Sequence, residues 1–254
     1  MRVLRAPGGC PWDREQTPAT LAPFVLEEAH EVIDAIERED WQTLRGEVGD
    51  LIFEGVFLAQ VCSEHGEFNV AESLRHVAAK LVRRHPHVFP PAGEDAAAQV
   101  SSPGKVVEQW EQIKARERAA ANASHAGTLD GIPRSLPALL AAYEIGGRAA
   151  AVGFDWEAAA DVLAKIEEEV AELRGAVTSE SSRRAAEEMG DLLFALANLS
   201  RKLGIEPEAA LRAANRKFIT RFRALEHEVE RVGRRPQDFT LDELEAIWQR
   251  VKRD

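Results

Sequence analysis

The sequence predicts an all-α protein with two tandem domains of the four-helix-bundle type, and three observations lead to this prediction. Apolar residues such as Leu44, Val48 and Leu51 recur at intervals of three, four and seven, which places them on one face of a helix. Neither the alternating pattern of β-strands nor an Asn-Gly hairpin turn is evident. Short blocks from the first half of the chain return in the same order in the second half, which predicts a duplicated domain.

The repeated blocks divide the 254-residue chain. They lie at residues 28–31, 47–53, 74–84 and 110–114, and they return at residues 169–172, 188–194, 211–221 and 248–252. The first two blocks return after the same interval of 141 residues. We therefore expect a first domain over residues 1–120, a linker rich in small residues over 121–133, and a second domain over 134–254.

The expected helices follow one another through short connections, which are typical of antiparallel neighbours in a bundle. The first repeat shows helical patterns at about 18–38, 41–64, 69–85 and 103–120. The second shows them at about 156–176, 180–203, 206–232 and 240–252, after a further helix near 134–151. Pro207 suits a first helical turn, where a backbone N–H has no partner within the helix. Thr240 and Glu243 form a capping box at the start of the last helix. Residues 90–104, rich in proline and glycine, are expected to form a loop.

The charge balance argues against a nucleic-acid polymer as partner. The chain has 43 acidic and 32 basic side chains and a formal net charge of −11, whereas binding to a phosphate backbone comes largely from Lys and Arg. A chain of this composition that acts on phosphates is expected to place a divalent cation between its own carboxylates and those phosphates.

Cysteine usage and hydropathy bear on the location of the protein. The chain has two cysteines, Cys10 and Cys62, a low number that suits a reducing compartment. No stretch approaches the ~18 uninterrupted apolar residues of a membrane-spanning helix. We therefore expect a cytoplasmic protein with no membrane partner.

Each repeat carries Glu-x-x-Glu on one expected helix and Glu-x-x-Asp on the next. Residues three apart share a helix face, so the four carboxylates converge if the two helices pack antiparallel. Repulsion between two such groups at ~4 Å reaches roughly 4 kcal/mol at an effective dielectric of 20, so fold stability alone does not favour the arrangement. A hard cation such as Mg²⁺ does, because it takes oxygen ligands and bridges carboxylates to phosphates. The expected metal ligands are Glu28, Glu31, Glu47 and Asp50 in the first repeat and Glu169, Glu172, Glu188 and Asp191 in the second.

Two other interpretations of these acidic residues stay open. A Glu-x-x-Glu pair is common on the solvated helix faces of an acidic protein, although apolar neighbours such as Val48 and Val170 place the quartets near the buried side. Glu27 and His30 have the Glu-x-x-His spacing of di-iron bundles. Such sites need two copies of that motif, and the corresponding position in the second repeat is Ala171.

Basic and aromatic residues of the second repeat are candidates for binding a phosphorylated ligand. Lys217 and Arg221 lie four apart on one helix face and offer a point charge and a bidentate fork to phosphate groups. Arg184 stands four residues before Glu188 and can reach the same pocket. Trp248 is large and flat enough to stack on a base. The alternatives are a basic solvated face and a tryptophan that anchors the core.

At this point the sequence resembles the two-domain MazG proteins, nucleoside triphosphate pyrophosphohydrolases of bacteria. Beyond the quartets, the resemblance rests on segments spread over nearly the whole chain. They are residues 9–13 (GCPWD), 26–28 (LEE), 83–89 (RRHPHVF), 132–139 (IPRSLPAL) and 152–156 (VGFDW). The resemblance implies an all-α homodimer that hydrolyses nucleoside triphosphates to monophosphates and pyrophosphate with Mg²⁺.

The resemblance also implies roles for individual residues. Metal ligands are implied at Glu169, Glu172, Glu188 and Asp191, and nucleotide contacts at Lys217, Arg221 and Trp248. Within the quartet, Glu172, Glu188 and Asp191 are the expected catalytic residues, one of them as the general base for an attacking water. The family shows Lys where Arg184 stands, a departure that keeps the charge and changes the geometry.

The expected activity has a broad base specificity, because the metal and the cations act mainly on the triphosphate, and this suits removal of aberrant nucleotides. Mn²⁺ is an expected substitute for Mg²⁺. Both quartets are complete, but the second repeat also has Asn215, opposite which the first has Ala78, so the second is favoured as the active one. The alternatives are an all-α interaction scaffold and a nucleotide-binding regulator without turnover.

Overall fold

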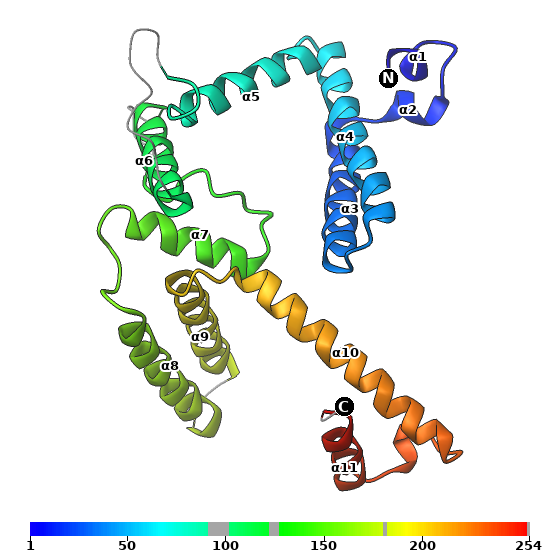
Figure 1. Ribbon diagram of the computed structural model, residues 1–254, viewed down its shortest axis with the longest axis vertical. Coiled ribbons are helices and arrows are strands. Elements are labelled where there is room, and N and C mark those ends of the chain that lie inside the picture. The colour runs from blue at the N-terminus through cyan, green and yellow to red at the C-terminus, as the bar shows by residue number, and fades with distance from the viewer. Residues whose placement is uncertain (91–101, 122–126, 180–181, 253–254) are drawn as a thin grey trace. The chain divides into compact units, whose positions relative to one another are not determined.

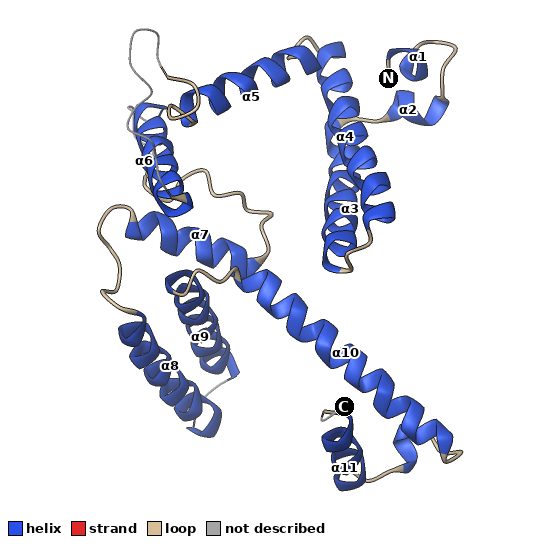
Figure 2. Cartoon of the chain, in the orientation of Figure 1, coloured by secondary structure: helices blue, strands red, loops and turns tan. Residues whose placement is uncertain are grey.

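The computed structural model describes residues 1–90, 102–121, 127–179 and 182–252. Within these ranges the regular structure is all helix, with no strand (Figure 1, Figure 2), which confirms the all-α fold class. The elements are α1 (Arg2–Arg5), α2 (Pro11–Glu15), α3 (Pro18–Glu37), α4 (Trp41–Glu64), α5 (Val70–Arg84), α6 (Pro103–Ala121), α7 (Ala138–Ala150), α8 (Ala159–Ser179), α9 (Ser182–Lys202), α10 (Pro207–Arg231), the 3₁₀ turn η1 (Pro236–Asp238) and α11 (Leu241–Val251). Among the described residues, none of these helices has the length and apolar character to cross a membrane.

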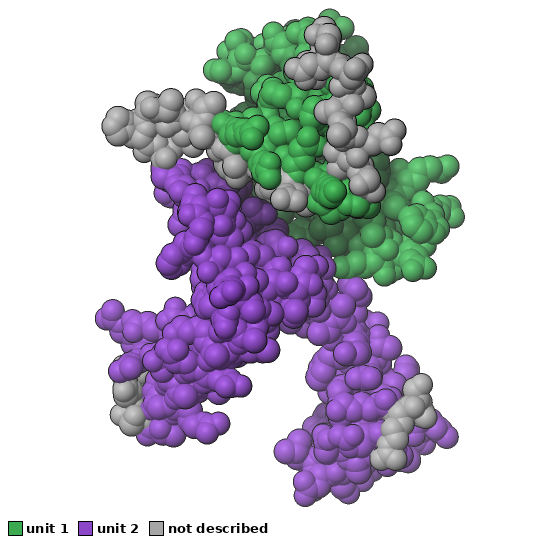
Figure 3. Space-filling model, turned by 60° about the vertical axis from the view of Figure 1, so that its left-hand side comes forward, with its two compact units in different colours: residues 1–118 green, residues 119–254 purple. Residues whose placement is uncertain are grey.

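The chain forms two compact units, residues 1–118 and 119–254, which Figure 3 colours separately. Helix α6 ends at Ala121, just past this division. Residues 122–126 of the expected linker and residues 91–101 of the expected loop lie outside the described ranges. Residues 127–133 of the expected linker, and residues 134–137 after it, form turns and irregular segments rather than a helix.

Unit 1 is organised around the helix pair α3 and α4, which pack together along their length. Thr17 caps α3 through a capping box, and the Asp40 carboxylate accepts a hydrogen bond from the Thr43 N–H at the start of α4 (3.0 Å). The short connection from Glu37, the last residue of α3, to Trp41, the first of α4, makes the two helices antiparallel neighbours. Leu21, Phe57 and Val61 are fully buried between them. This packing fixes which faces of α3 and α4 meet.

Unit 2 repeats this arrangement with α8 and α9, and α7 packs on α9 as a third helix. The close approach of α7 requires a glycine, because a Cβ at Gly146 would meet the side chain of buried Asn198. Asn198 itself donates a hydrogen bond to the Phe194 carbonyl (3.1 Å), so this polar residue has a structural role in the packing of α9. Ion pairs from Arg201 and Lys202 to Asp155 hold the segment before α8 against the end of α9.

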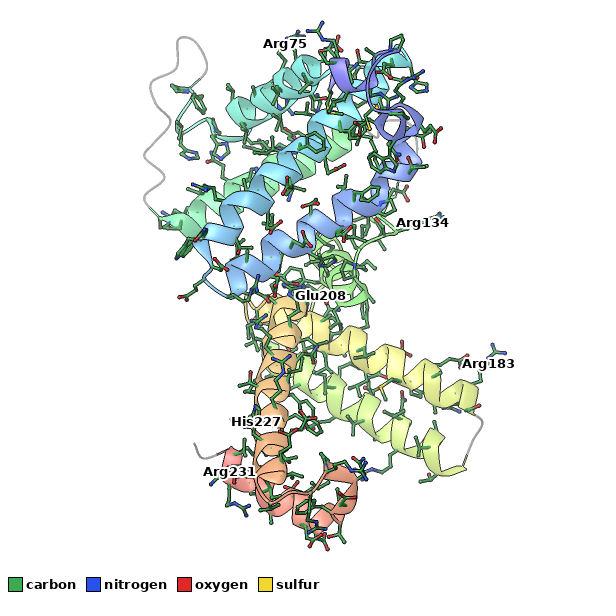
Figure 4. The ribbon with its side chains drawn as sticks, turned by 90° about the vertical axis from the view of Figure 1, so that its right-hand side faces the viewer. Arg75, Arg134, Arg183, Glu208, His227 and Arg231 are labelled. Atoms are coloured by element: carbon green, nitrogen blue, oxygen red, sulfur yellow. The ribbon has the colours of Figure 1, made fainter. Side chains whose placement is uncertain are left out.

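Helices α10 and α11 form a second layer of unit 2. Leu225 and Val229 of α10 are buried against Ile247 of α11. At its other end, α10 begins beside α7, where the Glu208 carboxylate accepts a hydrogen bond from the Leu139 N–H (3.2 Å; Figure 4). Unit 2 therefore has two packed centres, one at the α7–α8–α9 end and one at the α10–α11 end.

Two helices begin later than expected. α8 begins at Ala159 rather than near 156, because the Asp161 carboxylate accepts a hydrogen bond from the Ala158 N–H (2.8 Å). α7 begins at Ala138 rather than near 134, after Pro137 at its N-cap. The short helices α1 and α2 were not expected, since four and five residues are too few to show a helical period.

Candidate metal and nucleotide site

Three carboxylates converge between α8 and α9. Oxygen atoms of Glu169, Glu172 and Glu188 all lie within 4.8 Å of one another. Glu169 and Glu188 are buried, whereas Glu172 is exposed. The antiparallel packing of the two helices brings the Glu-x-x-Glu pair of α8 against the start of α9. The fourth member of the expected quartet, Asp191, is exposed on α9 one turn after Glu188 and is not part of this group of three.

The group of three carries an unsatisfied buried acceptor. Oxygen Oε2 of Glu169 is buried without a hydrogen-bond partner. Its other oxygen, Oε1, lies 2.8 Å from Nζ of Lys165, one turn earlier on α8. On the α9 side, Nε of Arg184 lies 3.2 Å from Oε1 of Glu188. The structure thus places Arg184 beside the carboxylates, as expected from its position four residues before Glu188.

The mutual repulsion of these acids affects their protonation. Loss of hydration raises the pKa of Glu172, and the charges of Glu188 and Glu169 raise it further. Hydrogen bonds to Glu168 and then Glu169 raise the pKa of Lys165, which keeps this lysine charged. A buried acceptor without a donor, surrounded by like charges, fits a hard divalent cation, whose ligands are oxygen atoms. The donor set therefore suits Mg²⁺ or Mn²⁺.

Unit 1 has an equivalent group between α3 and α4. Oxygen atoms of Glu28, Glu47 and Asp50 lie within 4.8 Å of one another. Oxygen Oε2 of Glu28 is buried without a partner. Partial burial is the largest cause that raises the pKa values of Glu28 and Glu47, and the charge of Glu31 is the next. Glu31, the fourth expected ligand, is not part of this group of three.

A basic pocket lies between α10 and α11. Its volume is about 780 Å³. The basic side chains Lys217, Arg221, Arg250 and Lys252 line it together with Ala224 and His227; Figure 4 labels His227 on α10. Lys217 and Arg221 therefore come together as their spacing predicted, and Arg250 and Lys252 add charge that sequence reasoning did not assign. The lining includes none of the carboxylates of α8 and α9.

Trp248 belongs to the packing of the α10–α11 end. Its ring lies 5.2 Å from the ring of Phe218 of α10. It also packs against the buried cluster that contains Leu225. Nζ of Lys252 lies 5.9 Å from the centre of the indole. In this structure Trp248 is thus a partly buried core residue beside the pocket, and the residues that line the pocket do not include it.

Comparisons with known proteins agree with this arrangement of helix pairs. The model for the MazG nucleotide pyrophosphohydrolase domain matches residues 16–89, and that for phosphoribosyl-ATP pyrophosphohydrolase matches residues 148–218. The whole chain is 49% identical to the nucleoside triphosphate pyrophosphohydrolase of Escherichia coli (strain K12) and covers 94% of that protein. Over 99% of its length it is 40% identical to the nucleoside triphosphate pyrophosphohydrolase/pyrophosphatase MazG of Thermotoga maritima, of which it covers 92%. The chain belongs to the MazG family.

The two matched segments of this MazG-family chain fall on the carboxylate helices. Residues 16–89 contain α3 and α4, and residues 148–218 contain α8 and α9. The second match also reaches Lys217 at the pocket. The chain is in addition 36% identical to the uncharacterized protein YabN of Bacillus subtilis, of which it covers 50%.

The basic pairs of the two MazG repeats have different surroundings. In unit 1, Arg84 occupies the position of Arg221, and its Nη2 lies 2.6 Å from Oε2 of Glu117 on α6. Arg83 binds the other oxygen of the same carboxylate. The hydrogen bonds from Arg84 and Arg83 lower the pKa of Glu117 to about 2. Arg84 is therefore already paired with an internal anion, whereas Arg221 faces a pocket.

Besides Arg250 and Lys252, the sequence analysis did not identify three further residues of this region, Lys165, Glu117 and Glu54. Lys165 stands four residues before Glu169, a spacing that was a usable signal for an ion pair on one helix face. Glu117 pairs with residues more than thirty positions away, and no local pattern indicates such a contact. Glu54 stands four residues after Asp50, and its burial depends on how the helices pack.

Proposed function

We propose that this chain is a Mg²⁺-dependent nucleoside triphosphate pyrophosphohydrolase that releases a nucleoside monophosphate and pyrophosphate, with Mn²⁺ as a substitute metal. Membership of the MazG family makes it a hydrolase of phosphoric anhydrides. The observation that supports the cation is the buried oxygen Oε2 of Glu169, which has no partner and belongs to a group of three converging carboxylates. Repulsion within such a group is relieved when a divalent cation binds.

The proposed roles follow from the surroundings of each residue. Glu169 and Glu188, both buried, would hold the ion, with Lys165 and Arg184 fixing their orientation from the outer side. When bound, Mg²⁺ supplies neutralisation of the triphosphate and Lewis-acid activation of the attacking water. Glu172 is exposed beside the two buried carboxylates, which suits a carboxylate that would accept the proton of that water as the bond between the α- and β-phosphates breaks.

Lys217 and Arg221 would bind the polyphosphate and the departing pyrophosphate. Four of the nine residues that line the pocket are Lys or Arg, which recognise phosphates, and one, Glu228, is acidic, so we propose a broad base specificity and a role in removing aberrant nucleotides from the cellular pool. Asn215, the polar neighbour that favoured the second repeat, is exposed on α10. The pairing of Arg84 with Glu117 also favours the second repeat as the site of turnover.

We further propose a homodimer. Large apolar side chains of α10 are exposed in the single chain: Leu211, Phe218, Ile219 and Phe222. On α9, Met189 and Leu193 are also exposed. Large apolar side chains that are exposed in such numbers on neighbouring helices of a single chain typically pack against another subunit. A second copy that covers α9 and α10 would also be able to bring a basic pocket to the carboxylates.

Product analysis tests the proposed reaction. The full chain is incubated with Mg²⁺ and each nucleoside triphosphate in turn, and the products are separated by anion-exchange chromatography. Monophosphate with equimolar pyrophosphate is the expected outcome for several bases. Diphosphate with phosphate would indicate an ordinary phosphatase, and the absence of products would favour a scaffold or a regulator. Light scattering after size-exclusion chromatography tests the dimer, and a mass of 28.0 kDa would contradict it.

A further inference from the structure

A fifth carboxylate, Glu54, extends the acidic group of unit 1 toward the core. Glu47, Asp50 and Glu54 follow one another at intervals of three and four on α4, so they lie along one helix face. Glu54 is 9% exposed. Phe57, one turn further on, belongs to the fully buried apolar cluster of unit 1. Glu54 therefore lies between the three converging carboxylates and the hydrophobic core.

Glu54 has no counter-charge among the described residues. Its oxygen Oε2 is buried and accepts no hydrogen bond. Burial raises the pKa of Glu54, and the one charge that adds to this effect is the like charge of Asp50. A buried carboxylate without a partner is strongly unfavourable in its ionised form. A bound cation would provide the missing partner.

The position of Glu54 separates it from the ion position of the main group. The oxygens of Glu28, Glu47 and Asp50 lie within 4.8 Å of one another, and Glu54 is not part of this group. An ion bound by these three residues would leave the carboxylate of Glu54 without a counter-charge. Asp50 is the neighbour shared by both positions, and one carboxylate can bind two cations through its two oxygens. In two-metal sites the ions are about 3.5–4 Å apart, a distance that one bridging carboxylate can span.

Unit 2 lacks this residue. The position that corresponds to Glu54 at the 141-residue interval is Ala195, which is buried at 4% exposure. The acidic face of α9 therefore ends where that of α4 continues. The two repeats therefore differ in the number of carboxylates along this helix face although their quartets are the same.

We propose that unit 1 holds two divalent cations of the Mg²⁺ or Mn²⁺ class, the second one bound between Asp50 and Glu54. This inference rests on the proposed function in one respect, namely that the group of Glu28, Glu47 and Asp50 binds the first ion. The second ion neutralises Glu54 and so stabilises the α3–α4 pair. Its class follows from the ligands, which are carboxylate oxygens.

Mn²⁺ binding to the full chain tests the proposal. Isothermal titration and electron paramagnetic resonance are run on two variants. Both carry Glu188→Gln, which disables the group of unit 2, and one of them also carries Glu54→Gln. We expect Glu54→Gln to lower the number of bound Mn²⁺ ions by one per chain. Two ions at the distance of a two-metal site couple magnetically, so Glu54→Gln should also restore the signal of an isolated ion. Equal stoichiometry and equal spectra in the two proteins would overturn the proposal.

Controls separate this inference from the proposed function. Glu67→Gln, an exposed acid just after α4, should leave the stoichiometry unchanged; a loss of one ion in this variant would contradict a specific role for Glu54. Glu28→Gln tests the first ion. Suppose that Glu28→Gln leaves the number of bound Mn²⁺ ions unchanged while Glu54→Gln lowers it by one. The main group of unit 1 is then not a metal site, and the proposed function is wrong for that unit. Glu54→Gln should raise the melting temperature measured without metal and reduce the further rise caused by Mn²⁺. Melting temperatures equal to those of the parent protein, both without metal and with Mn²⁺, would overturn the proposal.

Discussion

At the scale of single residues, burial separates acids that have the same sequence pattern. Glu169 and Glu188 are buried, whereas Asp191 is exposed and outside the group of three. The helical spacing predicted that each pair shares one helix face and that the four carboxylates converge if the two helices pack antiparallel, and the structure brings three of them together. Which of them meet depends on how α8 and α9 rotate against each other, and this rotation is set by apolar packing.

We expect Glu188→Gln to reduce kcat by at least about 100-fold. The substitution removes the charge of a buried oxygen ligand and leaves its size, and a single lost electrostatic contact in an active site has effects of this order. Steady-state rates of pyrophosphate release at saturating Mg²⁺ provide the measurement. Glu187→Gln is the matched control, since Glu187 is its exposed neighbour and pairs with Arg183, which projects into solvent (Figure 4). Equal rates in the two variants would contradict the assignment.

Arg184→Lys is expected to retain activity within about threefold, because Lys keeps the charge that faces Glu188. Arg184→Gln should raise the Mg²⁺ concentration required for half-maximal rate, since orienting partners of metal ligands affect affinity by about 10–100-fold. Rates measured across a Mg²⁺ series distinguish the two variants. An identical Mg²⁺ dependence in both would show that the charge of Arg184 does not act on Glu188.

At the scale of helices, close packing of α7 on α9 requires glycine at one position and tolerates a side chain at the next. A Cβ at Gly146 would meet the buried side chain of Asn198 and lie 3.2 Å from Nε of Arg201. At Gly147 the nearest atom, Cδ of Arg201, is 3.8 Å away, which is an ordinary contact. The two adjacent glycines are indistinguishable in the sequence.

We expect Gly146→Ala to lower the free energy of unfolding by about 1–3 kcal/mol, because the added methyl group overpacks the interface. Gly147→Ala should instead raise it by up to about 1 kcal/mol, since alanine favours the helix. Urea unfolding of both variants measures the difference. A stabilisation of similar size in both would show that α7 and α9 are further apart than the structure places them.

A second prediction at this scale concerns the tie between α5 and α6. Glu117→Gln removes the charge that pairs with Arg83 and Arg84. We expect the free energy of unfolding to fall by about 1 kcal/mol only, because Arg83 is 55% exposed and solvent screens its interaction with Glu117. The pKa of Glu117 is lowered to about 2 in the folded state, so its contribution is complete above about pH 4.5 and is lost as the pH falls toward 2. Unfolding of wild type and variant at pH 7 and pH 3 measures this: the difference in the free energy of unfolding should be smaller at pH 3, and an equal difference at both pH values would refute the prediction.

At the scale of the whole molecule, the acidic groups couple stability to pH and to metal. The pKa values of Glu28, Glu47, Glu54 and Glu172 are all raised from the ordinary value of 4.5. These groups bind more protons in the folded than in the unfolded state just above pH 4.5, so the stability of the metal-free protein falls as the pH rises through that range.

We therefore expect the melting temperature of the protein in EDTA to rise when the pH is lowered from about 7 to about 5. Saturating Mg²⁺ should reverse this trend, because the ion binds the deprotonated carboxylates. Differential scanning calorimetry in both conditions measures it. A melting temperature that rises with pH in EDTA would show that repulsion within these groups does not limit stability.

Much of the fold was determined by the sequence itself. Helical periods gave the long helices and their caps, because hydrogen bonds within a helix and the spacing of its apolar face are local properties. The repeated blocks gave the equivalence of the carboxylate helices. The carboxylate spacing and the family resemblance gave the candidate ligands.

The tertiary structure decided which of these residues meet, because burial and counter-charges come from other elements. The packing of the helices brings Glu169, Glu172 and Glu188 together. It places Lys217 and Arg221 in a pocket with Arg250 and Lys252. It packs Trp248 against a buried apolar cluster. The tertiary structure also showed that Arg84 is bound by Glu117 and that Glu54 is buried without a partner. These contacts join residues far apart in the chain or depend on helix rotation, and a local sequence pattern carries no information about either.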